Sequence, residues 1–230
     1  IDSLQKLNIK INKNREFLKL RTILSTGSPL TDDNFLYVYT QWKKNVQLSS
    51  ISGGTDIISC FALGNPILPV YKGELQSIGL GMSVMSYNSN GDSIISEKGE
   101  LVCTKPFPSM PIYFWNDDNG KKYFNAYFSR FSDVWTHGDY ISINDRGGVK
   151  IHGRSDATLN PGGVRIGTSE IYKIVEKFSS IQDSVAVGVN IDGDEKILLF
   201  IKAEKKLDDD FSKDIKNKLK IHCSPRHVPY

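Results

Sequence analysis

The amino-acid sequence predicts a mixed α/β fold that consists of three successive parts. Strand and helix patterns alternate from residue 1 to about 68, which is typical of an α/β segment. From about 69 to 155, short apolar runs are separated by glycine turn signals, which predicts a small β-barrel or sandwich. Residues 156–230 carry amphipathic helix patterns before and after two strand patterns. We therefore expect a small β-α-β-β-α domain to begin at Asp156.

The first part begins with a strand, a turn and a helix. The apolar run at 21–25 ends at Thr26-Gly27-Ser28-Pro29, and Thr31 can cap the helix that follows. That helix carries its apolar side chains at Phe35, Leu36, Val38, Tyr39 and Trp42. Residues 46–51 predict a second strand, which runs into a glycine turn at 52–56.

Local signals of other kinds define the middle and last parts. The short strands of the middle part are separated by turn signals at Asn90-Gly91, Lys98-Gly99, Asn119-Gly120 and Arg146-Gly147-Gly148. In the last part, Thr168-Ser169-Glu170 predicts a cap for a helix whose apolar positions recur at helical spacing, namely Ile171, Ile174, Val175 and Phe178. Strands are predicted at 184–190 and 196–203. A final helix begins at 208–210, and its early acids and later lysines match the helix dipole.

Composition and charge exclude several classes of protein. With 39% hydrophobic and 24% charged residues, the chain is globular rather than disordered. Its net charge of +3 is too small to require nucleic acid or a membrane surface as partner. The apolar run at 197–201 is far shorter than the roughly 20 residues of a membrane helix. Cys60, Cys103 and Cys223 lie outside any CxxC pair, so we expect no disulfide framework, no zinc site and a cytoplasmic location.

Small polar loops after strands are where open α/β sheets bind ligands, and the first is Ser52-Gly53-Gly54-Thr55-Asp56. Neither GxxxxGK[ST] nor GxGxxG occurs in the chain, which argues against simple kinase and dinucleotide sites. The two glycines let a backbone approach a ligand closely, Thr55 offers a hydroxyl to a phosphate, and Asp56 offers a hard oxygen to Mg²⁺. The alternative is a plain turn with an Asx hydrogen bond.

The second polar loop is Trp135-Thr136-His137-Gly138-Asp139. The carboxylate of Asp139 can accept hydrogen bonds from both hydroxyls of a ribose, and an ordinary turn carboxylate is the alternative. We interpret His137 as a packed or solvated histidine rather than a catalytic base, because no nucleophile motif such as GxSxG accompanies it.

The third polar loop extends from Ile151 to Ile171. Arg154 and Arg165 flank Pro161-Gly162-Gly163 and supply two permanently charged groups for phosphate or ribose on a segment that can pivot. A linker with surface arginines is the alternative.

The third loop contains the pattern GRxDxxxNxxGxRIxxxEI, with about ten positions in register. On this pattern the chain resembles the adenylate-forming superfamily of acyl-CoA synthetases, luciferases and peptide-synthetase adenylation domains. Further segments resemble the superfamily members that activate acetoacetate, and the likeness covers nearly the whole chain. They are SGGTDI at 52–57, GNP at 64–66, PVYKG at 69–73, FPSMP at 107–111, RGG at 146–148, HGRSDATLNPGGVRIGT at 152–168 and SPRHVP at 224–229.

The resemblance implies site roles for residues of all three loops and of the first turn. The implied ATP- and AMP-binding set is Gly27, Ser28, Pro29, Thr55, Asp139, Arg154 and Arg165. The first three would form the adenine-facing turn. Thr55 and Arg165 would be catalytic contacts to the phosphates, and Asp139 and Arg154 would bind the ribose. Asp56 would hold Mg²⁺.

The resemblance also implies the surroundings of the nucleotide. Gly163 would line the tunnel for the thiol of coenzyme A, and Asp156 would be the hinge of the small domain. Gly53 and Gly54 would line the acyl pocket. Acetate-activating relatives carry a tryptophan at the position of Gly53, so a glycine would leave room for a longer acyl group. Equally, Gly53 could be required only for the backbone conformation.

The implied activity is that of an AMP-forming acid–thiol ligase with ATP, Mg²⁺, acetoacetate and coenzyme A as its small-molecule partners. Residues 1–155 would be the C-terminal part of the large adenylation domain, and residues 156–230 most of a mobile small domain. The phosphate loop would precede Ile1 and the active-site lysine would follow Tyr230. We therefore expect a piece of a longer enzyme, inactive by itself. A ligase for another short or medium acid and a non-catalytic interaction module remain the alternatives.

Overall fold

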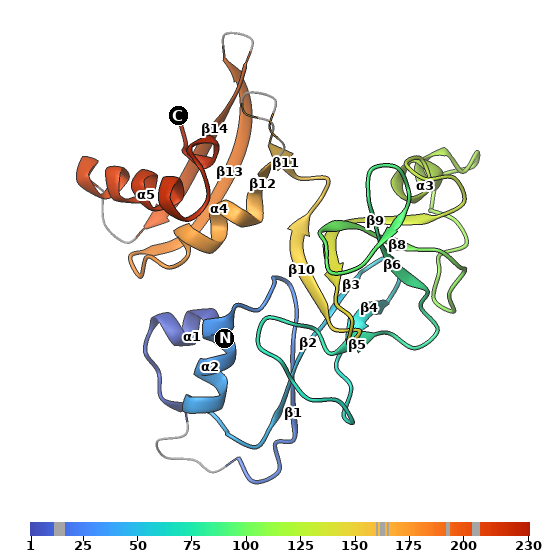
Figure 1. The fold of residues 1–230 in the computed structure, drawn as a ribbon, viewed down its shortest axis with the longest axis horizontal. Coiled ribbons are helices and arrows are strands. Elements are labelled where there is room, and N and C mark those ends of the chain that lie inside the picture. The colour runs from blue at the N-terminus through green and yellow to red at the C-terminus, as the bar shows by residue number, and fades with distance from the viewer. Residues whose placement is uncertain (12–16, 160, 162–163, 165, 192–193, 204–207) are drawn as a thin grey trace. The chain divides into compact units, whose positions relative to one another are not determined.

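A computed structural model of the chain describes residues 1–11, 17–159, 161, 164, 166–191, 194–203 and 208–230 (Figure 1). The chain divides into two compact units, Ile1–Ile151 and His152–Tyr230. No helix in the described ranges is long and apolar enough to cross a membrane.

The first unit begins with the predicted strand, helix and strand, preceded by a short helix α1 (Asp2–Lys6). Strands β1 (Thr22–Ser25) and β2 (Gln47–Ser50) are parallel, as expected when a helix connects them. The connecting helix α2 (Asp32–Gln41) starts where the sequence predicts, because the Thr31 hydroxyl accepts a hydrogen bond from the Asn34 amide at 3.3 Å. Phe35, Val38, Val46 and Leu48 form the buried core of this segment.

A three-stranded antiparallel sheet of β3 (Ser52–Gly54), β4 (Ser59–Leu63) and β5 (Ser77–Ile78) follows. Here the prediction of a glycine turn at 52–56 is partly wrong, since both glycines lie in β3 and the turn comes after them. A Cβ atom at Gly53 would lie 2.0 Å from the carbonyl oxygen of Ser59 on the opposite strand. The glycine therefore permits a close approach of two strands rather than a turn.

The strands of the middle part pair in the order β10-β9-β8-β6-β7. Their bounds are β6 (Val84–Tyr87), β7 (Ser93–Ile94), β8 (Gly99–Cys103), β9 (Trp135–Ile143) and β10 (Val149–Arg154). This order is an open one, so a closed barrel is not seen in the described part of the chain. The short helix α3 (Lys121–Tyr127) precedes β9. A second buried core of the first unit consists of Ile57, Phe61, Ala62, Leu75, Val84, Leu101, Cys103, Phe107, Trp135, Ile141 and Val149.

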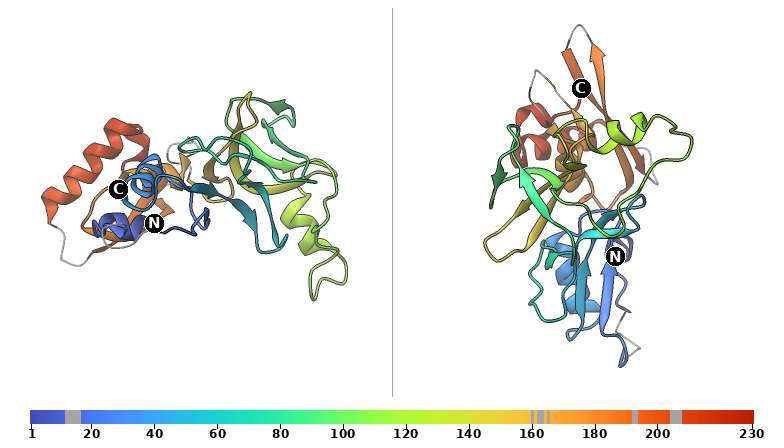
Figure 2. Two further views of the ribbon diagram at one scale, coloured as in Figure 1. Left: turned by 90° about the horizontal axis from the view of Figure 1, so that it is seen from below. Right: turned by 90° about the vertical axis from the view of Figure 1, so that its right-hand side faces the viewer.

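The second unit is built around the long antiparallel hairpin of β13 (Ile181–Ile191) and β14 (Asp194–Ala203). A short pair, β11 (Thr158–Leu159) and β12 (Ile166–Gly167), precedes the helix α4 (Thr168–Val175). Helix α5 (Asp209–His222) and a 3-10 turn, η3 (Pro225–His227), follow the hairpin. Ile197 of the hairpin shares one buried core with Ile174 of α4 and Leu219 of α5. Figure 2 gives two further views of the ribbon, in which the red helix is α5.

The two helix starts of this unit compare differently with the sequence. Helix α5 begins where the sequence predicts, and Asp208 is its N-cap, because its carboxylate accepts a hydrogen bond from the Phe211 amide at 2.8 Å. The predicted cap at 168–170 is wrong, since Gly167 is the N-cap of α4 and no side chain bonds there. The hydroxyl of Ser169 donates to the carbonyl oxygen of His152 instead. The apolar face of α4 is buried as its spacing predicts.

Candidate active site

The first turn and the first glycine segment leave the same edge of the β1-β2 pair. Ser25 and Ser50 are register partners at the carboxyl ends of the two parallel strands, and the Ile51 amide donates to the Ser25 carbonyl at 2.8 Å. Gly27 follows β1 with a φ of +95°, a conformation that L side chains rarely adopt. The turn of Gly27, Ser28 and Pro29 and the strand β3 therefore begin side by side, at the edge where open sheets bind ligands.

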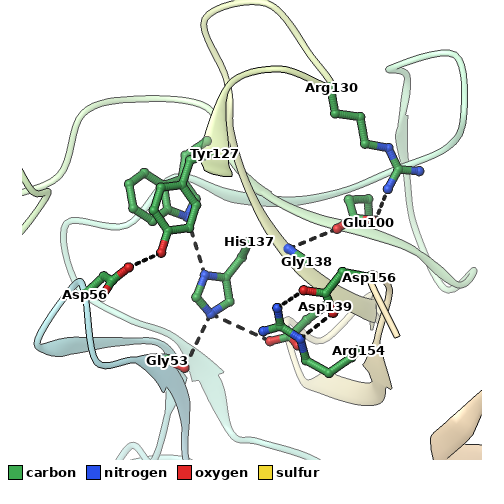
Figure 3. Close-up of polar contacts among 11 residues, drawn as sticks. Gly53, Asp56, Glu100, Tyr127, Arg130, His137, Gly138, Asp139, Arg154 and Asp156 are labelled. Carbon is green, nitrogen blue, oxygen red and sulfur yellow. Dashed lines mark hydrogen bonds and ion pairs between the residues drawn. The ribbon is translucent and has the colours of Figure 1, made fainter. Parts of the chain in front are cut away.

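Thr55 and Asp56 lie in the turn between β3 and β4, and both are exposed. The next residue, Ile57, is fully buried and anchors the turn in the core. The hydroxyl of Tyr127, at the end of α3, donates a hydrogen bond to the Asp56 carboxylate (Figure 3). The hydroxyl and the carboxylate predicted to bind phosphate and Mg²⁺ thus project from a turn that is tied to the protein at two points.

Asp139 lies in β9 and is buried, with 8% of its surface exposed. Its neighbour His137 brings it together with the glycine segment. The Nε2 atom of His137 lies 3.8 Å from Oδ2 of Asp139 and 3.4 Å from the carbonyl oxygen of Gly53 (Figure 3). Two of the three predicted loops are therefore joined through one imidazole ring.

A buried ion pair, which sequence reasoning missed, supports the backbone next to Asp139. Glu100 is 1% exposed, accepts a hydrogen bond from the Gly138 amide at 3.1 Å and pairs with Arg130 (Figure 3). Gly138 has a φ of +82°, and the register of β8 with β9 shifts between Glu100 and Val102. The sequence offered one signal for this ion pair, namely the single carboxylate of Glu100 within the otherwise apolar segment 99–103. A carboxylate in such a segment is buried only when it has a partner.

The aromatic side chains behind the turn connect α3 to β9. The ring of Tyr127 stacks on that of Trp135 with centroids 3.6 Å apart, and the Trp135 indole N–H donates to Nδ1 of His137 at 3.5 Å. Asp117 holds the start of α3 by accepting from the amides of Lys122 and Tyr123 at 3.0 and 2.9 Å. Burial works against its charged form, yet these amides lower the pKa of the Asp117 carboxyl below its usual value.

The second unit holds the remaining predicted residues. Arg154 and Asp156 form an ion pair with each other, in which Nε of Arg154 donates to Oδ1 of Asp156 at 2.8 Å (Figure 3). Their side chains are 50% and 58% exposed. Gly163 and Arg165, predicted for the thiol tunnel and for a phosphate contact, lie outside the described residues.

The segment 224–229 is attached to α4 through a buried histidine. Nδ1 of His227 lies 2.9 Å from the Ser224 hydroxyl, and its Nε2 lies 3.1 Å from Oε2 of Glu170. His227 is 8% exposed. These contacts join the glutamate at the end of the third loop to a motif more than fifty positions later in the chain, a link that the sequence did not reveal.

Comparisons with known proteins agree with the sequence resemblance. No protein-family model matches the chain. The acetoacetyl-coenzyme A synthetase of Rhizobium meliloti (strain 1021) is 49% identical over 231 residues, which cover 100% of this chain and 36% of that protein. The acetoacetyl-CoA synthetase of Gallus gallus is 51% identical over 230 residues, or 98% of this chain and 34% of that protein.

Among solved structures, the acetoacetyl-CoA synthetase from Streptomyces lividans matches with a TM-score of 0.86 and 40% sequence identity. The match covers 99% of this chain and 35% of that one. The chain thus spans about a third of the length of the curated relatives that it matches. Over nearly its whole length, the chain is similar to one part of these acetoacetyl-CoA synthetases, at 40% to 51% sequence identity.

Proposed function

We propose that this protein, in its complete form, activates acetoacetate with ATP and transfers the acetoacetyl group to coenzyme A. The observation that carries the proposal is the contact of His137 with both Asp139 and Gly53. Through it, a carboxylate suited to ribose hydroxyls lies next to the glycine segment that would face the acyl group. Relatives at about half identity carry the name of this activity, which supports the same reaction here.

The reaction follows from the chemistry of carboxylates, which are poor electrophiles until one oxygen becomes part of a good leaving group. A carboxylate oxygen of acetoacetate attacks the α-phosphorus of ATP, the bond to the bridging oxygen breaks, and pyrophosphate leaves. The sulfur of coenzyme A then attacks the acyl carbon of acetoacetyl-AMP. The carbon–oxygen bond to AMP breaks, and the thiol proton passes to solvent.

The described residues would bind and orient the nucleotide in this scheme. The hydroxyl of Thr55 would donate a hydrogen bond to the phosphates. Asp139 would accept hydrogen bonds from the ribose hydroxyls, and Arg154 would donate a hydrogen bond to the ribose. Gly27, with Ser28 and Pro29, would face the adenine. The roles of Gly163 at the thiol tunnel and Arg165 at the phosphate belong to the same proposal, as does the hinge at Asp156 between the two half-reactions.

Mg²⁺ would be bound with ATP. Among the described residues no group of three or more His, Cys, Asp or Glu side chains could hold a metal ion. Asp56 fits as one hard oxygen ligand, because its carboxylate is exposed at the turn that also carries Thr55. The ion would neutralise charge on the departing pyrophosphate.

The acyl pocket would lie at Gly53 and Gly54. The close contact of Gly53 with the carbonyl oxygen of Ser59 is a sufficient structural reason for a glycine there. This contact supports the explanation that Gly53 is required for the backbone conformation. The wider pocket for a four-carbon acid remains part of our proposal. A panel of short and medium acids, scored by pyrophosphate release, would separate acetoacetate from the other acids.

We propose the cytoplasm as the compartment, since all three cysteines are unpaired thiols.

The substitution Asp139→Ala tests the proposal in the protein encoded by the complete gene. We expect ATP affinity to fall roughly 10- to 100-fold, because hydrogen bonds to a charged group are lost. Titration calorimetry measures the affinity, and circular dichroism monitors the fold. The control is Asp145→Ala, an exposed aspartate of the same unit. Unchanged ATP affinity in Asp139→Ala would refute the nucleotide assignment.

A further inference from the structure

His137 is enclosed by groups of the first unit. It is 8% exposed, and its ring meets the ring of Phe61 edge-on with centroids 4.8 Å apart. The Trp135 indole N–H donates to Nδ1 at 3.5 Å. An imidazole held by an aromatic face and a hydrogen bond keeps one orientation, so its second nitrogen has a defined direction.

The donor from Trp135 determines what the second nitrogen does. An indole N–H can only donate, so Nδ1 must accept. In the neutral ring the proton then resides on Nε2, which makes Nε2 a donor. This atom lies 3.4 Å from the carbonyl oxygen of Gly53 and 3.8 Å from the carboxylate of Asp139. The proton on Nε2 can therefore be donated to the β3 backbone at Gly53, while the buried carboxylate of Asp139 lies beside the same atom, beyond hydrogen-bond distance.

The same ring occupies space that a side chain at position 54 would need. A Cβ atom on Gly54 would lie 2.9 Å from Cε1 and 3.4 Å from Nε2 of His137. Contacts below about 3 Å are not tolerated by packed side chains, so His137 and Gly54 are complementary in size. The position of the ring and the position of the glycine strand therefore depend on each other.

We propose that His137 is a positioning residue that couples the nucleotide carboxylate to the acyl-pocket strand. The proposal rests on the proposed function for the identity of the two ligands. Through Trp135, which stacks on Tyr127, the same set of contacts reaches Asp56 (Figure 3). A change at His137 should consequently alter the binding of both substrates, ATP and acetoacetate, rather than of one.

The kinetic test compares His137→Ala with His137→Gln in the protein from the complete gene. For His137→Ala we expect the KM values for ATP and acetoacetate each to rise about tenfold or more, because displaced groups lose their productive geometry. The side-chain amide of His137→Gln retains a hydrogen-bond donor, so both KM values should return much of the way to those of the wild type. His222→Ala, an exposed histidine on α5, is the control. Unchanged KM values, or equal damage by Gln and Ala, would overturn the proposal.

A second measurement is independent of the substrates. In this chain, Gly54→Ala should lower the midpoint of denaturant unfolding, whereas in the His137→Ala background it should lower it much less. An equal loss in both backgrounds would contradict the inference that a side chain at position 54 and the His137 ring compete for the same space.

If wild-type protein released no pyrophosphate with acetoacetate, the proposed function would be wrong. Titration of ATP into His137→Ala would still show whether the ring positions Asp139.

Discussion

Asp139 in the first unit and Arg154 in the second are held in place by different means. Asp139 is 8% exposed and lies beside an imidazole that is itself held by Trp135. Arg154 is half exposed and pairs with Asp156, only two positions along the chain. Buried contacts orient a group before a ligand arrives, whereas an exposed pair, worth about 0–1 kcal/mol, exchanges partners at little cost. The first arrangement suits a rigid site, and the second suits the hinge that we propose at Asp156.

The strongest way to break this contrast is to remove the buried support of Asp139. We expect Glu100→Ala to lower the free energy of unfolding by about 3 kcal/mol, because Arg130 and the Gly138 amide lose their acceptor. Denaturation with urea, followed by tryptophan fluorescence, measures the loss. Glu97→Ala, an exposed glutamate nearby, should be nearly neutral. Equal stability of the two variants would mean that the ion pair does not hold the strand.

A smaller effect is expected at the glycine strand. Gly53→Ala should cost about 2 kcal/mol of unfolding free energy, because its Cβ overlaps the Ser59 carbonyl and the strands must separate. Ser52→Ala in the same strand is the matched control. If Gly53→Ala were stable but changed the preferred acid in the complete protein, the acyl-pocket explanation would replace the backbone one.

The smallest effect on stability is expected in the second unit. Arg154→Ala should change the unfolding free energy by less than about 0.5 kcal/mol, since the pair with Asp156 is exposed. In the complete protein the same substitution should still weaken ATP binding. Lys202→Ala, another exposed cation of this unit, controls for the loss of charge. A stability loss as large as that of Glu100→Ala would remove the distinction between the two regions.

Local patterns predicted much of the fold. The strand pair β1-β2, the capped helix α2 and the acidic start of α5 follow from signals within a few residues of each element. The same signals misplaced the cap of α4, because the Ser169 hydroxyl bonds to His152, seventeen positions earlier. They also assigned Gly53 and Gly54 to a turn, because a glycine needed for a close strand contact is indistinguishable from one needed for a turn.

The sequence by itself determined which residue types could bind a nucleotide and an acyl group, since hydroxyls, carboxylates and glycines carry that chemistry wherever they lie. Only the tertiary structure decided what orients them. Tyr127 contacts Asp56 across 71 positions, Arg130 reaches Glu100 across 30, and His137 meets Gly53 across 84. Such contacts depend on how strands pair and which side chains share the core. A free-energy balance over many distant groups sets that pairing, and no short window of sequence contains it.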